Sequence, residues 1–411
     1  KYWIDEQGNQ LNPAKVADAY HQFNATYGQH NANKSMASNW TELGPWSWTQ
    51  TSSWSPGLGR IDAIAIHPLN NNIIYAGSPN GGCWKTTNGG TNWTSLTDGQ
   101  TYMKIGDVEV DSANINIVYI GTMGSGMLKS TNGGTTLALS GTGLPGGANF
   151  RKIIVNPQNS SVVICATSGG MYRSTNAGAN WTLAASGSYY DCDFKPYDPS
   201  VVYACGQNFY KSTNGGTSFT QITSGITVTD VMRLAVTPAN PSLVCVVQCA
   251  GSVFGKFYKS TNSGTSFTTT ITGNSGNGTN FFGYDPNCSD NSGQGGYNID
   301  ITISPADANE IHIGGIITWK SVDGGSTFVS TTEWDYPNST GYTHCDMHAL
   351  EYVGTKLYTG SDGGISVSTD NGGSFTPIGF GMGIRMFYRM GCAKTSATTI
   401  AYQRTIRLIL L

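Results

Sequence analysis

One short segment of the chain brings together residue types that bind metal ions. His344, Asp346 and His348 alternate along His344-Cys345-Asp346-Met347-His348, and alternate side chains of an extended strand project to the same side. Two imidazoles and a carboxylate suit a divalent transition metal, so these three residues are a candidate metal site. The alternative is that they make hydrogen bonds that fix a loop against a strand.

Two further segments combine aromatic rings with carboxylates. They are GNSGNGTNFFGYDPNCSDNSGQGG and STTEWDYPNSTGYTHCDMH, and such long loops often carry function. The candidate ligand-binding residues are Phe281, Tyr284, Asp285, Asp290, Trp334 and Tyr336. Aromatic faces beside carboxylates suit sugars, while packing of the two loops against each other is the alternative. The acidic loop also offers oxygen ligands for Ca²⁺, although it matches no EF-hand.

Four carboxylates are candidates for acid and base chemistry. Glycoside hydrolysis needs two carboxyl groups on either side of the scissile bond, and the candidates here are Asp230, Asp300, Asp346 and Asp362. Structural carboxylates occupy comparable positions in many proteins, so we assign none of these residues a catalytic role from the sequence. Whether they meet depends on the elements that position them.

The composition favours short strands and tight turns. Of 411 residues, 54 are glycine and only 11% are charged, which is not a helical composition. A net charge of -3 without long runs of like charge argues against nucleic acid as a partner. We find no transmembrane segment, and no cofactor is required by any motif. Cys192 with Cys205, and Cys288 with Cys345, are the candidate disulfide pairs among nine cysteines.

One pattern occurs seven times: Ser or Thr, any residue, Asn or Asp, any residue, Gly, two further residues, then an aromatic residue or Leu. The copies begin at Thr86, Ser130, Ser174, Ser212, Ser260, Ser321 and Ser368. Their spacing of 38 to 61 residues is typical of a four-stranded propeller blade. In each copy the third residue is expected to cap a hairpin turn and the glycine to supply positive φ. The capping residues are Asn88, Asn132, Asn176, Asn214, Asn262, Asp323 and Asp370.

These repeats predict an all-β fold, a β-propeller of seven or eight four-stranded blades. Residues 39–403 form the propeller in this interpretation, residues 1–38 an N-terminal extension with a short helix at 13–27, and residues 404–411 a tail. A strand from Trp40 is expected to close the ring, because pairing it into the last blade removes an exposed edge. Residues 384–403 resemble the first two strands of another blade.

The repeats resemble the Asp-box, or BNR-repeat, family known from sialidases, sortilin-type receptors and xyloglucanase-like glycosidases. GGCWKTTNGGTNW, THCDMHAL and LYTGSDGG are similar to large secreted propeller proteins of Bacteroidota. That resemblance implies export by the type IX system. It also implies that the repeated turns are structural and lie on the face opposite the ligand. Five of the seven copies carry Asn where the family has Asp.

The resulting hypothesis is a secreted or cell-surface, non-catalytic propeller that binds glycans, extracellular proteins or copies of itself through the face with the long loops. A glycoside hydrolase of xyloglucanase or sialidase type is the alternative. The turn Ser78-Pro79-Asn80-Gly81-Gly82 lacks the acid that a xyloglucanase-like enzyme would carry there. A sortilin-like peptide receptor is the second alternative.

Overall fold

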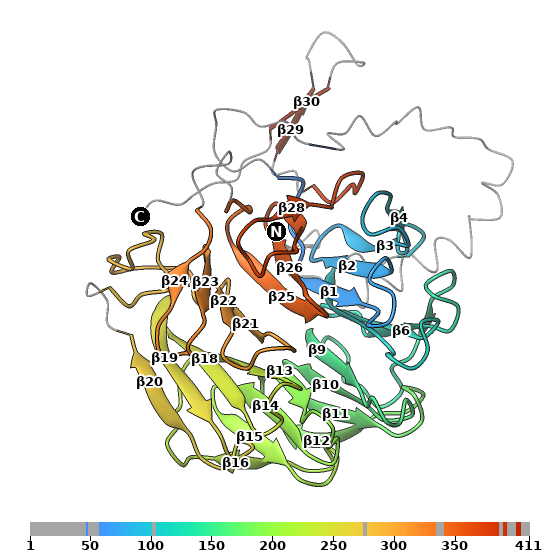
Figure 1. Ribbon diagram of the computed structural model, residues 1–411. Helices are drawn as coiled ribbons and strands as arrows, with labels where there is room; N and C mark the ends of the chain where they lie inside the picture. Colours follow the sequence, from blue (N-terminus) through green and yellow to red (C-terminus); the bar gives the residue numbers. More distant parts are fainter. Residues whose placement is uncertain are drawn as a thin grey trace, which may run out of the picture.

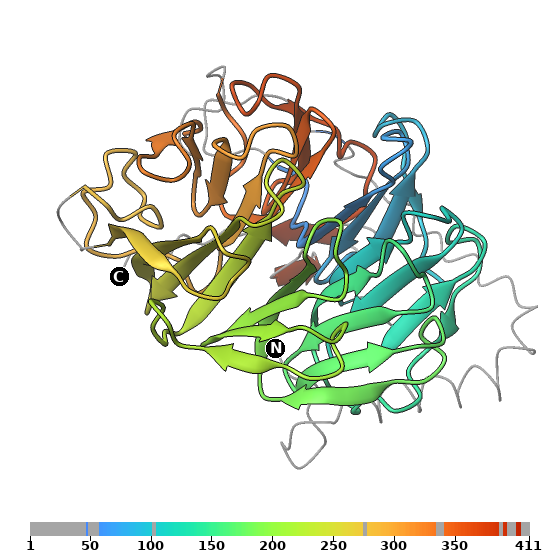
Figure 2. The same ribbon diagram turned by 60° about the horizontal axis from the view of Figure 1, so that its bottom comes forward.

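The computed structural model describes residue 47 and residues 57–100, 104–273, 278–333, 341–385, 389–392 and 400–403. Within them the chain is all-β, and its strands form seven four-stranded antiparallel sheets. The sheets are the seven blades of a propeller around a central axis (Figures 1 and 2). The predicted fold class is therefore confirmed, with seven blades. The expected helix at 13–27 and the strand from Trp40 lie outside the described residues.

Each blade is built from four strands that are consecutive in the chain. The first comprises β1 (Ala63–Ile66), β2 (Ile74–Ser78), β3 (Gly82–Thr86) and β4 (Thr94–Ser95). The second comprises β5 (Ile105–Val110), β6 (Val118–Thr122), β7 (Met127–Ser130) and β8 (Ala138–Leu139). The third comprises β9 (Phe150–Val155), β10 (Val163–Thr167), β11 (Gly170–Ser174) and β12 (Thr182–Ser186). The fourth comprises β13 (Tyr189–Phe194), β14 (Val202–Gly206), β15 (Phe209–Ser212) and β16 (Thr220–Ile222).

The remaining three blades follow the same plan. The fifth comprises β17 (Val231–Val236), β18 (Val244–Ala250), β19 (Val253–Ser260) and β20 (Thr268–Thr272). The sixth comprises β21 (Asp300–Ile303), β22 (Ile311–Gly314), β23 (Thr318–Ser321) and β24 (Val329–Ser330). The seventh comprises β25 (Met347–Val353), β26 (Lys356–Ser361), β27 (Gly364–Ser368) and β28 (Thr376–Pro377). A separate two-stranded sheet pairs β29 (Arg389–Cys392) with β30 (Ile400–Gln403).

The hydrophobic core lies between the blades. The second strand of each blade is apolar and buried, as in β6 and β10, because both faces of a blade pack against neighbouring sheets. Each core cluster accordingly joins two successive blades; Tyr75 of β2, for example, packs with Val108 of β5. The first strands lie near the axis and the short fourth strands at the rim (Figure 1). This arrangement turns the first strands into the lining of the axis.

The seven repeated turns are closed by the same hydrogen bonds. In the third blade, the Ser174 hydroxyl donates to Asn176 Oδ1 (2.9 Å), and Gly178 N donates to Ser174 Oγ (2.8 Å). The amide of Asn180 donates to Asn176 Oδ1 at 2.8 Å. Equivalent bonds occur in the other six copies. The capping geometry expected from the sequence is therefore present with either Asn or Asp.

A basic residue at the end of the third strand links each of six blades to the next turn. Lys129 Nζ donates to the Ala177 carbonyl at 2.6 Å, and Arg173 Nε donates to the Gly215 carbonyl at 2.7 Å. Lys85, Lys211, Lys259 and Lys320 make corresponding bonds. In the seventh blade this position is Val367. Among the described residues, the interface between the seventh and first blades therefore has no such hydrogen bond.

The ring closes by contact between the seventh and first blades. The amides of Leu58 and Ile61 donate to the carbonyls of Gly363 (2.8 Å) and Ser361 (3.0 Å). Trp93 Nε1 donates to the Ile378 carbonyl at 2.7 Å. All four strands of the last sheet come from one continuous stretch of chain.

The cysteines of the described chain are buried in this scaffold. The eight whose side chains are described are free thiols, so neither candidate disulfide, Cys192 with Cys205 or Cys288 with Cys345, is formed. Burial raises the pKa of the Cys83 thiol to about 12, which makes it a small apolar core residue. In the same part of the chain, we find no helix with the length and hydropathy to span a bilayer.

Candidate functional site

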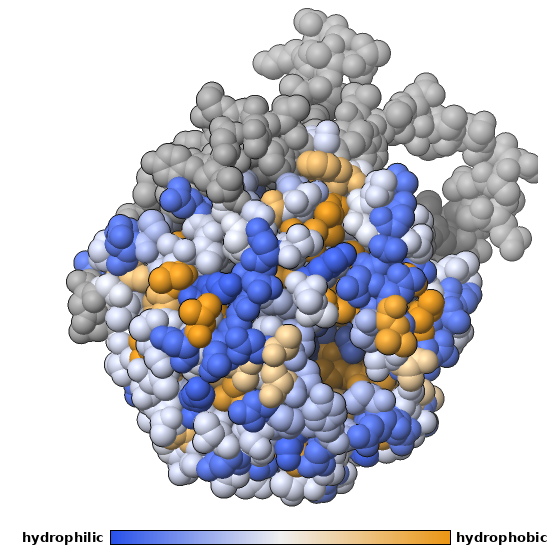
Figure 3. Space-filling model, viewed as in Figure 1, coloured by the Kyte–Doolittle hydropathy of each residue, from blue (hydrophilic) through white to orange (hydrophobic). Residues whose placement is uncertain are grey.

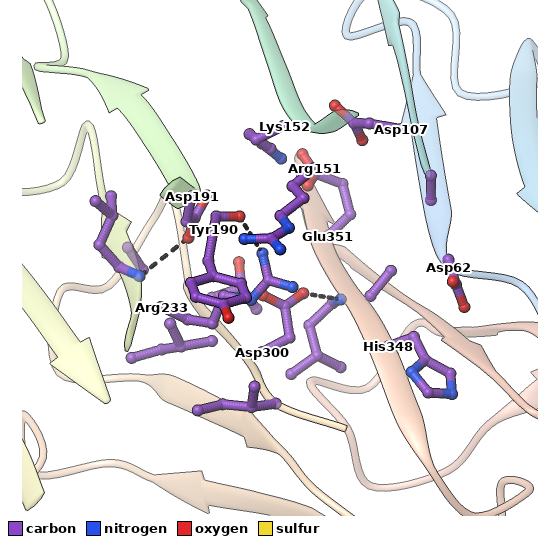
Figure 4. Close-up of a pocket in the computed structure, with 18 of the residues that line it drawn as sticks. Asp62, Asp107, Arg151, Lys152, Tyr190, Asp191, Arg233, Asp300, His348 and Glu351 are labelled. Atoms are coloured by element: carbon purple, nitrogen blue, oxygen red, sulfur yellow. Dashed lines mark hydrogen bonds between the residues drawn. The ribbon is translucent and has the colours of Figure 1, made fainter. Parts of the chain in front are cut away.

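The first strands of the blades line a cavity of about 350 Å³ on the axis of the ring. The molecular surface is hollowed near the centre of the face shown in Figure 3. The cavity wall is dominated by charged side chains (Figure 4). Because the backbone edges of seven strands face the same space, the side chains beside those edges decide what the cavity accepts.

Charges alternate in sign at one level of this cavity. The residues at this level share a register: each pairs with a residue near the end of the second strand, as Asp107 pairs with Gly121 of β6 and Asp300 with Gly314, the last residue of β22. In blades two to six they are Asp107, Lys152, Asp191, Arg233 and Asp300, and in blades one and seven they are Ala63 and Ala349. Alternating signs let neighbouring side chains attract one another across the blades.

The three carboxylates of this level satisfy backbone amides of the next blade. Ile153 N donates to Asp107, Leu234 N to Asp191 Oδ2 at 3.0 Å, and Leu350 N to Asp300 Oδ2 at 2.7 Å. These amides lie on the first strands of their blades. The inner edges of these strands face the axis and pair with no other described strand. A carboxylate accepting a backbone N–H is a strong hydrogen bond. The role of these groups is therefore to hold the inner edges together.

One lysine balances most of the acids deeper in the cavity. Glu109, Asp193 and Glu351 lie two residues further along their strands. Burial raises the pKa of Asp107 and of Asp193 to about 7, and it raises the pKa of Glu109 well above its usual value. Although burial opposes its charge, these acids hold the pKa of Lys152 well above its usual value. The deep part is a compact network of acids around one lysine.

Two arginines stand at a different part of the cavity, beside Tyr190. The Arg151 guanidinium lies 3.9 Å from the Tyr190 ring centroid, and its Nη1 donates to Ser188 Oγ (2.9 Å) and to the Tyr189 carbonyl (3.2 Å). Arg233 Nη1 donates to the Tyr190 carbonyl at 2.6 Å, while its buried Nε has no partner. Figure 4 shows both guanidinium groups next to Tyr190.

Neither of these arginines forms an ion pair within the described chain. No described carboxylate oxygen lies within 4.0 Å of Arg151 or Arg233. Burial lowers the pKa of Arg151, and the charge of Arg233 lowers it further. Burial also opposes the charge of Arg233, but Asp191 and Asp300 hold its pKa above the usual value. Arg151 is thus a half-buried cation whose partners are neutral.

A second cluster lies between the first, sixth and seventh blades. Arg60 forms an ion pair with Asp62 and stacks 4.5 Å from the Tyr297 ring centroid. The Tyr297 hydroxyl donates to Asp362 Oδ2 at 3.2 Å, and His348 Nε2 lies 2.9 Å from Asp362 Oδ1. Although burial opposes ionisation, the contact with His348 holds the pKa of Asp362 below its usual value. These charges are internally paired, unlike Arg151.

The candidate metal site is not assembled. Strand β25 starts only at Met347, and Asp346 has a positive φ of 65°, so the segment is not one extended strand. Asn298 Nδ2 donates to Asp346 Oδ1 at 2.8 Å, while His344 Nδ1 lies 3.0 Å from its neighbour's carbonyl. Among the described residues, no three His, Cys, Asp or Glu side chains could hold a metal ion. The turn at Asp346 breaks the alternation from which a site at His344, Asp346 and His348 was expected.

The candidate ligand-binding residues of the first long loop stabilise that loop. Phe281 is 4% exposed and stacks against Phe254 and Trp319, so it is a core residue and not a surface platform. Asp290 accepts the amides of Tyr284 and Asp285, and Asp285 accepts the Asn287 amide at 2.8 Å. The Tyr284 hydroxyl accepts a hydrogen bond from Gln294 Nε2 at 3.1 Å. Trp334 and Tyr336 lie outside the described residues.

The four candidate catalytic carboxylates do not gather at one place. Asp300 lines the cavity, whereas Asp230 is exposed and accepts the Gly251 amide at 2.6 Å in the turn between β18 and β19. Asp346 and Asp362 are close enough to interact: burial first, and then the charge of Asp362, raises the pKa of Asp346 to about 7. Asp346 is only 7% exposed, which leaves little access for a substrate.

The alternating level was readable from the sequence and was missed. Each first strand ends at a turn that begins with His67, Asp111, Asn156, Lys195, Thr237 or Ser304. Counting back four residues gives Ala63, Asp107, Lys152, Asp191, Arg233 and Asp300. Aligning the repeats on this turn therefore identifies the level. Tyr190 and Tyr297 carry no comparable signal, because local bends of the chain place them.

Comparison with known proteins shows the fold alone. No family model and no curated protein matches the chain. Among solved structures, an ancestral GH74 enzyme has a TM-score of 0.60 at 17% identity, covering 79% of this chain and 47% of that one. The GH74 xyloglucanase from Xanthomonas campestris has a TM-score of 0.59 at 16% identity, with 78% and 54% covered. This chain therefore spans about half the length of these enzymes.

Another solved propeller matches over nearly its whole length. The structure of YCF48 bound to D1 peptide has a TM-score of 0.53 at 17% identity, covering 78% of this chain and 97% of that one. The extracellular domain of a hybrid two-component system from B. thetaiotaomicron has a TM-score of 0.55 at 13% identity, with 77% and 39% covered. Propellers similar to this one thus include enzymes, a peptide-bound protein and an extracellular domain.

Proposed function

We propose that this chain is a non-catalytic binding propeller that takes part of a protein ligand into the cavity beside Arg151. The observation that carries the proposal is the pair of guanidinium groups at Tyr190, which have unused donors and no carboxylate within 4.0 Å in the described chain. A half-buried cation without a counter-charge is costly in the free protein. A ligand that supplies the missing acceptor recovers that cost on binding.

The state of the carboxylates also favours binding over hydrolysis. Asp107, Asp191 and Asp300 are each occupied by a backbone amide of the next blade. A general acid or base needs access to the bond that it acts on. Carboxylates that hold the strand edges together do not provide it.

A protein ligand is favoured over a glycan by the aromatic residues. Guanidinium groups cover a face of Tyr190 and a face of Tyr297, and Phe281 is in the core. Among the described residues, these three rings are therefore at least partly occupied by contacts within the chain. The YCF48 structure, which contains a bound peptide, has a propeller of similar extent. Glycans and further copies of this chain are the other ligand classes.

We place the protein outside the cell in this proposal. The resemblance of its repeats to secreted propellers supports this location, as does the likeness of its fold to an extracellular domain. The scarcity of charged residues, 11% of the chain, fits a turn-rich extracellular scaffold.

A glycoside hydrolase is the second candidate. The observation that favours it is the pair Asp346 and Asp362, whose pKa values are moved in opposite directions, as in sites where one carboxyl group is an acid and the other a base. Against it, Asp362 is engaged by His348 and Tyr297. Asp346 is buried.

Parallel assays separate the two functions. The protein is applied to defined glycan and synthetic peptide arrays and incubated with the same polysaccharides in hydrolysis assays, with Asp346→Asn and Arg151→Gln variants. The proposal predicts peptide binding that Arg151→Gln weakens, without hydrolysis. Hydrolysis that Asp346→Asn abolishes would replace it with the enzymatic function.

A further inference from the structure

The cavity at Arg151 offers a specific set of hydrogen-bond donors. Arg151 uses Nη1 for the Ser188 hydroxyl and the Tyr189 carbonyl. The Tyr190 side chain is its other neighbour, and it raises the pKa of Arg151 against the effect of burial. Arg233 uses Nη1 for the Tyr190 carbonyl, and its Nε is buried without a partner. Guanidinium groups are planar donors whose geometry matches a carboxylate.

The two arginines are held in place before any ligand arrives. The Tyr190 ring supports Arg151 from one side, and the Tyr190 carbonyl fixes Arg233. Both groups therefore keep their charges close together although the charges repel each other. Burial is the main cause of the lowered pKa of Arg151, and the charge of Arg233 contributes to it. An anion between two like charges relieves that repulsion and satisfies the free donors at once.

The charges on the rest of the cavity wall favour a ligand that carries its negative charge at one end only. Acids dominate the deep part, where Glu109, Asp193 and Glu351 surround Lys152. These acids already balance the charge of Lys152. The paired cluster at Arg60 already has its counter-charges in Asp62 and Asp362. Arg151, whose hydrogen bonds go to a hydroxyl and a carbonyl, is thus a cation of the described cavity wall that is left to attract an anion.

Resting on the proposed function, we infer that Arg151 and Arg233 form a carboxylate site that anchors a peptide ligand through a chain terminus or an acidic side chain. The carboxylate accepts hydrogen bonds from the free donors of both arginines. The backbone of the ligand lies toward the cavity opening, away from the deep acids. Ser188 and Tyr190 position Arg151 and do not contact the anion.

The test uses tetrapeptides as probes in ligand-observed NMR. One probe, N-acetyl-Gly-Ser-Gly-Ala, has a free terminal carboxylate. The second is its C-terminal amide, and the third is the amide with Glu in place of Ala, which carries the carboxylate on a side chain. Diglucuronate supplies a carboxylate on a sugar. Each is titrated into the full chain and into Arg151→Gln, Arg233→Gln and Lys256→Gln. Lys256 is a partly exposed base on β19, and it is not among the residues that line the cavity.

The site predicts that a peptide carboxylate binds and that the plain amide binds at least about tenfold more weakly, since a hydrogen bond to a charged group contributes about 1.5 to 3 kcal/mol. Each arginine variant is expected to lose about tenfold or more in affinity, and Lys256→Gln to keep it. The free acid and the Glu amide show which source of carboxylate is preferred. Melting temperatures of the variants, measured alongside, exclude misfolding as the cause.

Other outcomes overturn the inference in distinguishable ways. Equal binding of acid and amide, or binding unchanged in Arg151→Gln, removes the carboxylate site but leaves a peptide-binding propeller. Binding of diglucuronate alone, lost in Arg151→Gln, keeps the anion site and refutes the peptide ligand. If no probe binds at concentrations up to about 10 mM, the site itself is refuted. That limit corresponds to a binding free energy of under about 3 kcal/mol in magnitude. Cleavage of a probe refutes the proposed function.

Discussion

The guanidinium of Arg151 lies 3.9 Å from the ring centroid of Tyr190, in the neighbouring blade. This contact joins β9 to β13 and aims a half-buried cation into the axial cavity. A cation over an aromatic face contributes about 0.5 to 2 kcal/mol. Tyr190 therefore holds Arg151 ready for an anion that the described chain does not supply.

Removing the Tyr190 ring is expected to weaken binding without removing a donor. In Tyr190→Ala the Arg151 side chain loses its support, so ligand affinity falls by about three- to tenfold. Tyr190→Phe keeps the aromatic face and is expected to stay within about twofold of the wild type. Isothermal titration of the same peptide into both variants measures the difference. An equal loss in the two variants would show that the hydroxyl, and not the ring, matters.

Cutting one link between blades is expected to lower stability. Lys129→Met keeps the aliphatic chain but loses the bond to the Ala177 carbonyl, which leaves a carbonyl in the turn without its donor. The free energy of unfolding should fall by about 1 to 2 kcal/mol, as measured by urea denaturation. Lys256→Met is the control, since Lys256 Nζ makes only long contacts, with Thr227 Oγ1 at 3.5 Å and with the Tyr258 ring centroid at 5.9 Å. If both variants lose the same amount, the link is not a stabilising contact.

The last interface offers the opposite experiment. Val367 occupies the position that is basic in the other six blades, and the residue equivalent to Ala177 in the first blade is Gly89. Val367→Lys should place an amine near the Gly89 carbonyl and raise the free energy of unfolding by about 0.5 to 1 kcal/mol. Val367→Met controls for side-chain length. A lysine variant no more stable than the methionine variant would contradict the equivalence of the seven interfaces.

The acids of the deep cavity predict a dependence of stability on pH. Burial raises the pKa of Asp193 to about 7 in the folded chain, whereas an unfolded aspartate has a pKa of about 3.9. The folded state holds the extra proton between these values, so its contribution is complete below about pH 4 and is lost as the pH rises through about 7. Asp193→Asn keeps the shape of the protonated group. It should match the wild type near pH 4 and exceed it at pH 8 by on the order of 2 kcal/mol.

Asp198, which follows the same strand, provides the matched control. A hydrogen bond from Ser200 lowers the pKa of Asp198, so its contribution is present at neutral pH and lost in acid. Asp198→Asn should therefore lower stability at pH 7 but not near pH 3. Urea denaturation across the pH range measures both variants. A parallel response of the two would contradict the assignment of the raised pKa to Asp193.

The scaffold could be predicted from the sequence because it repeats. Seven copies of one turn predict a propeller of seven or eight blades, and the bonds of Asn176 and its equivalents follow from the residue types. The roles of single residues were harder to predict from the sequence. Phe281 resembles a surface ring by its place in a long loop, yet it fills the space beside Trp319. His344, Asp346 and His348 resemble a metal site only while the chain is extended, and the positive φ of Asp346 cannot be read from its neighbours.

The residues of the cavity were only partly predictable from the sequence. Asp107, Lys152, Asp191, Arg233 and Asp300 share one register and can be found by aligning the repeats. The pairing of each carboxylate with an amide of the next blade depends on the closure of the ring, which no local pattern contains. Arg151 stands one residue earlier on its strand, and its lack of an acidic partner is visible only in three dimensions.

A crystal structure of the chain with the tightest-binding tetrapeptide tests the central claim most directly. The account predicts an intact peptide in the axial cavity, with a carboxylate oxygen about 2.7 to 2.9 Å from donors of both Arg151 and Arg233. A peptide bound at the rim with the arginine pair unoccupied, or a cleaved peptide beside Asp346 and Asp362, would contradict it.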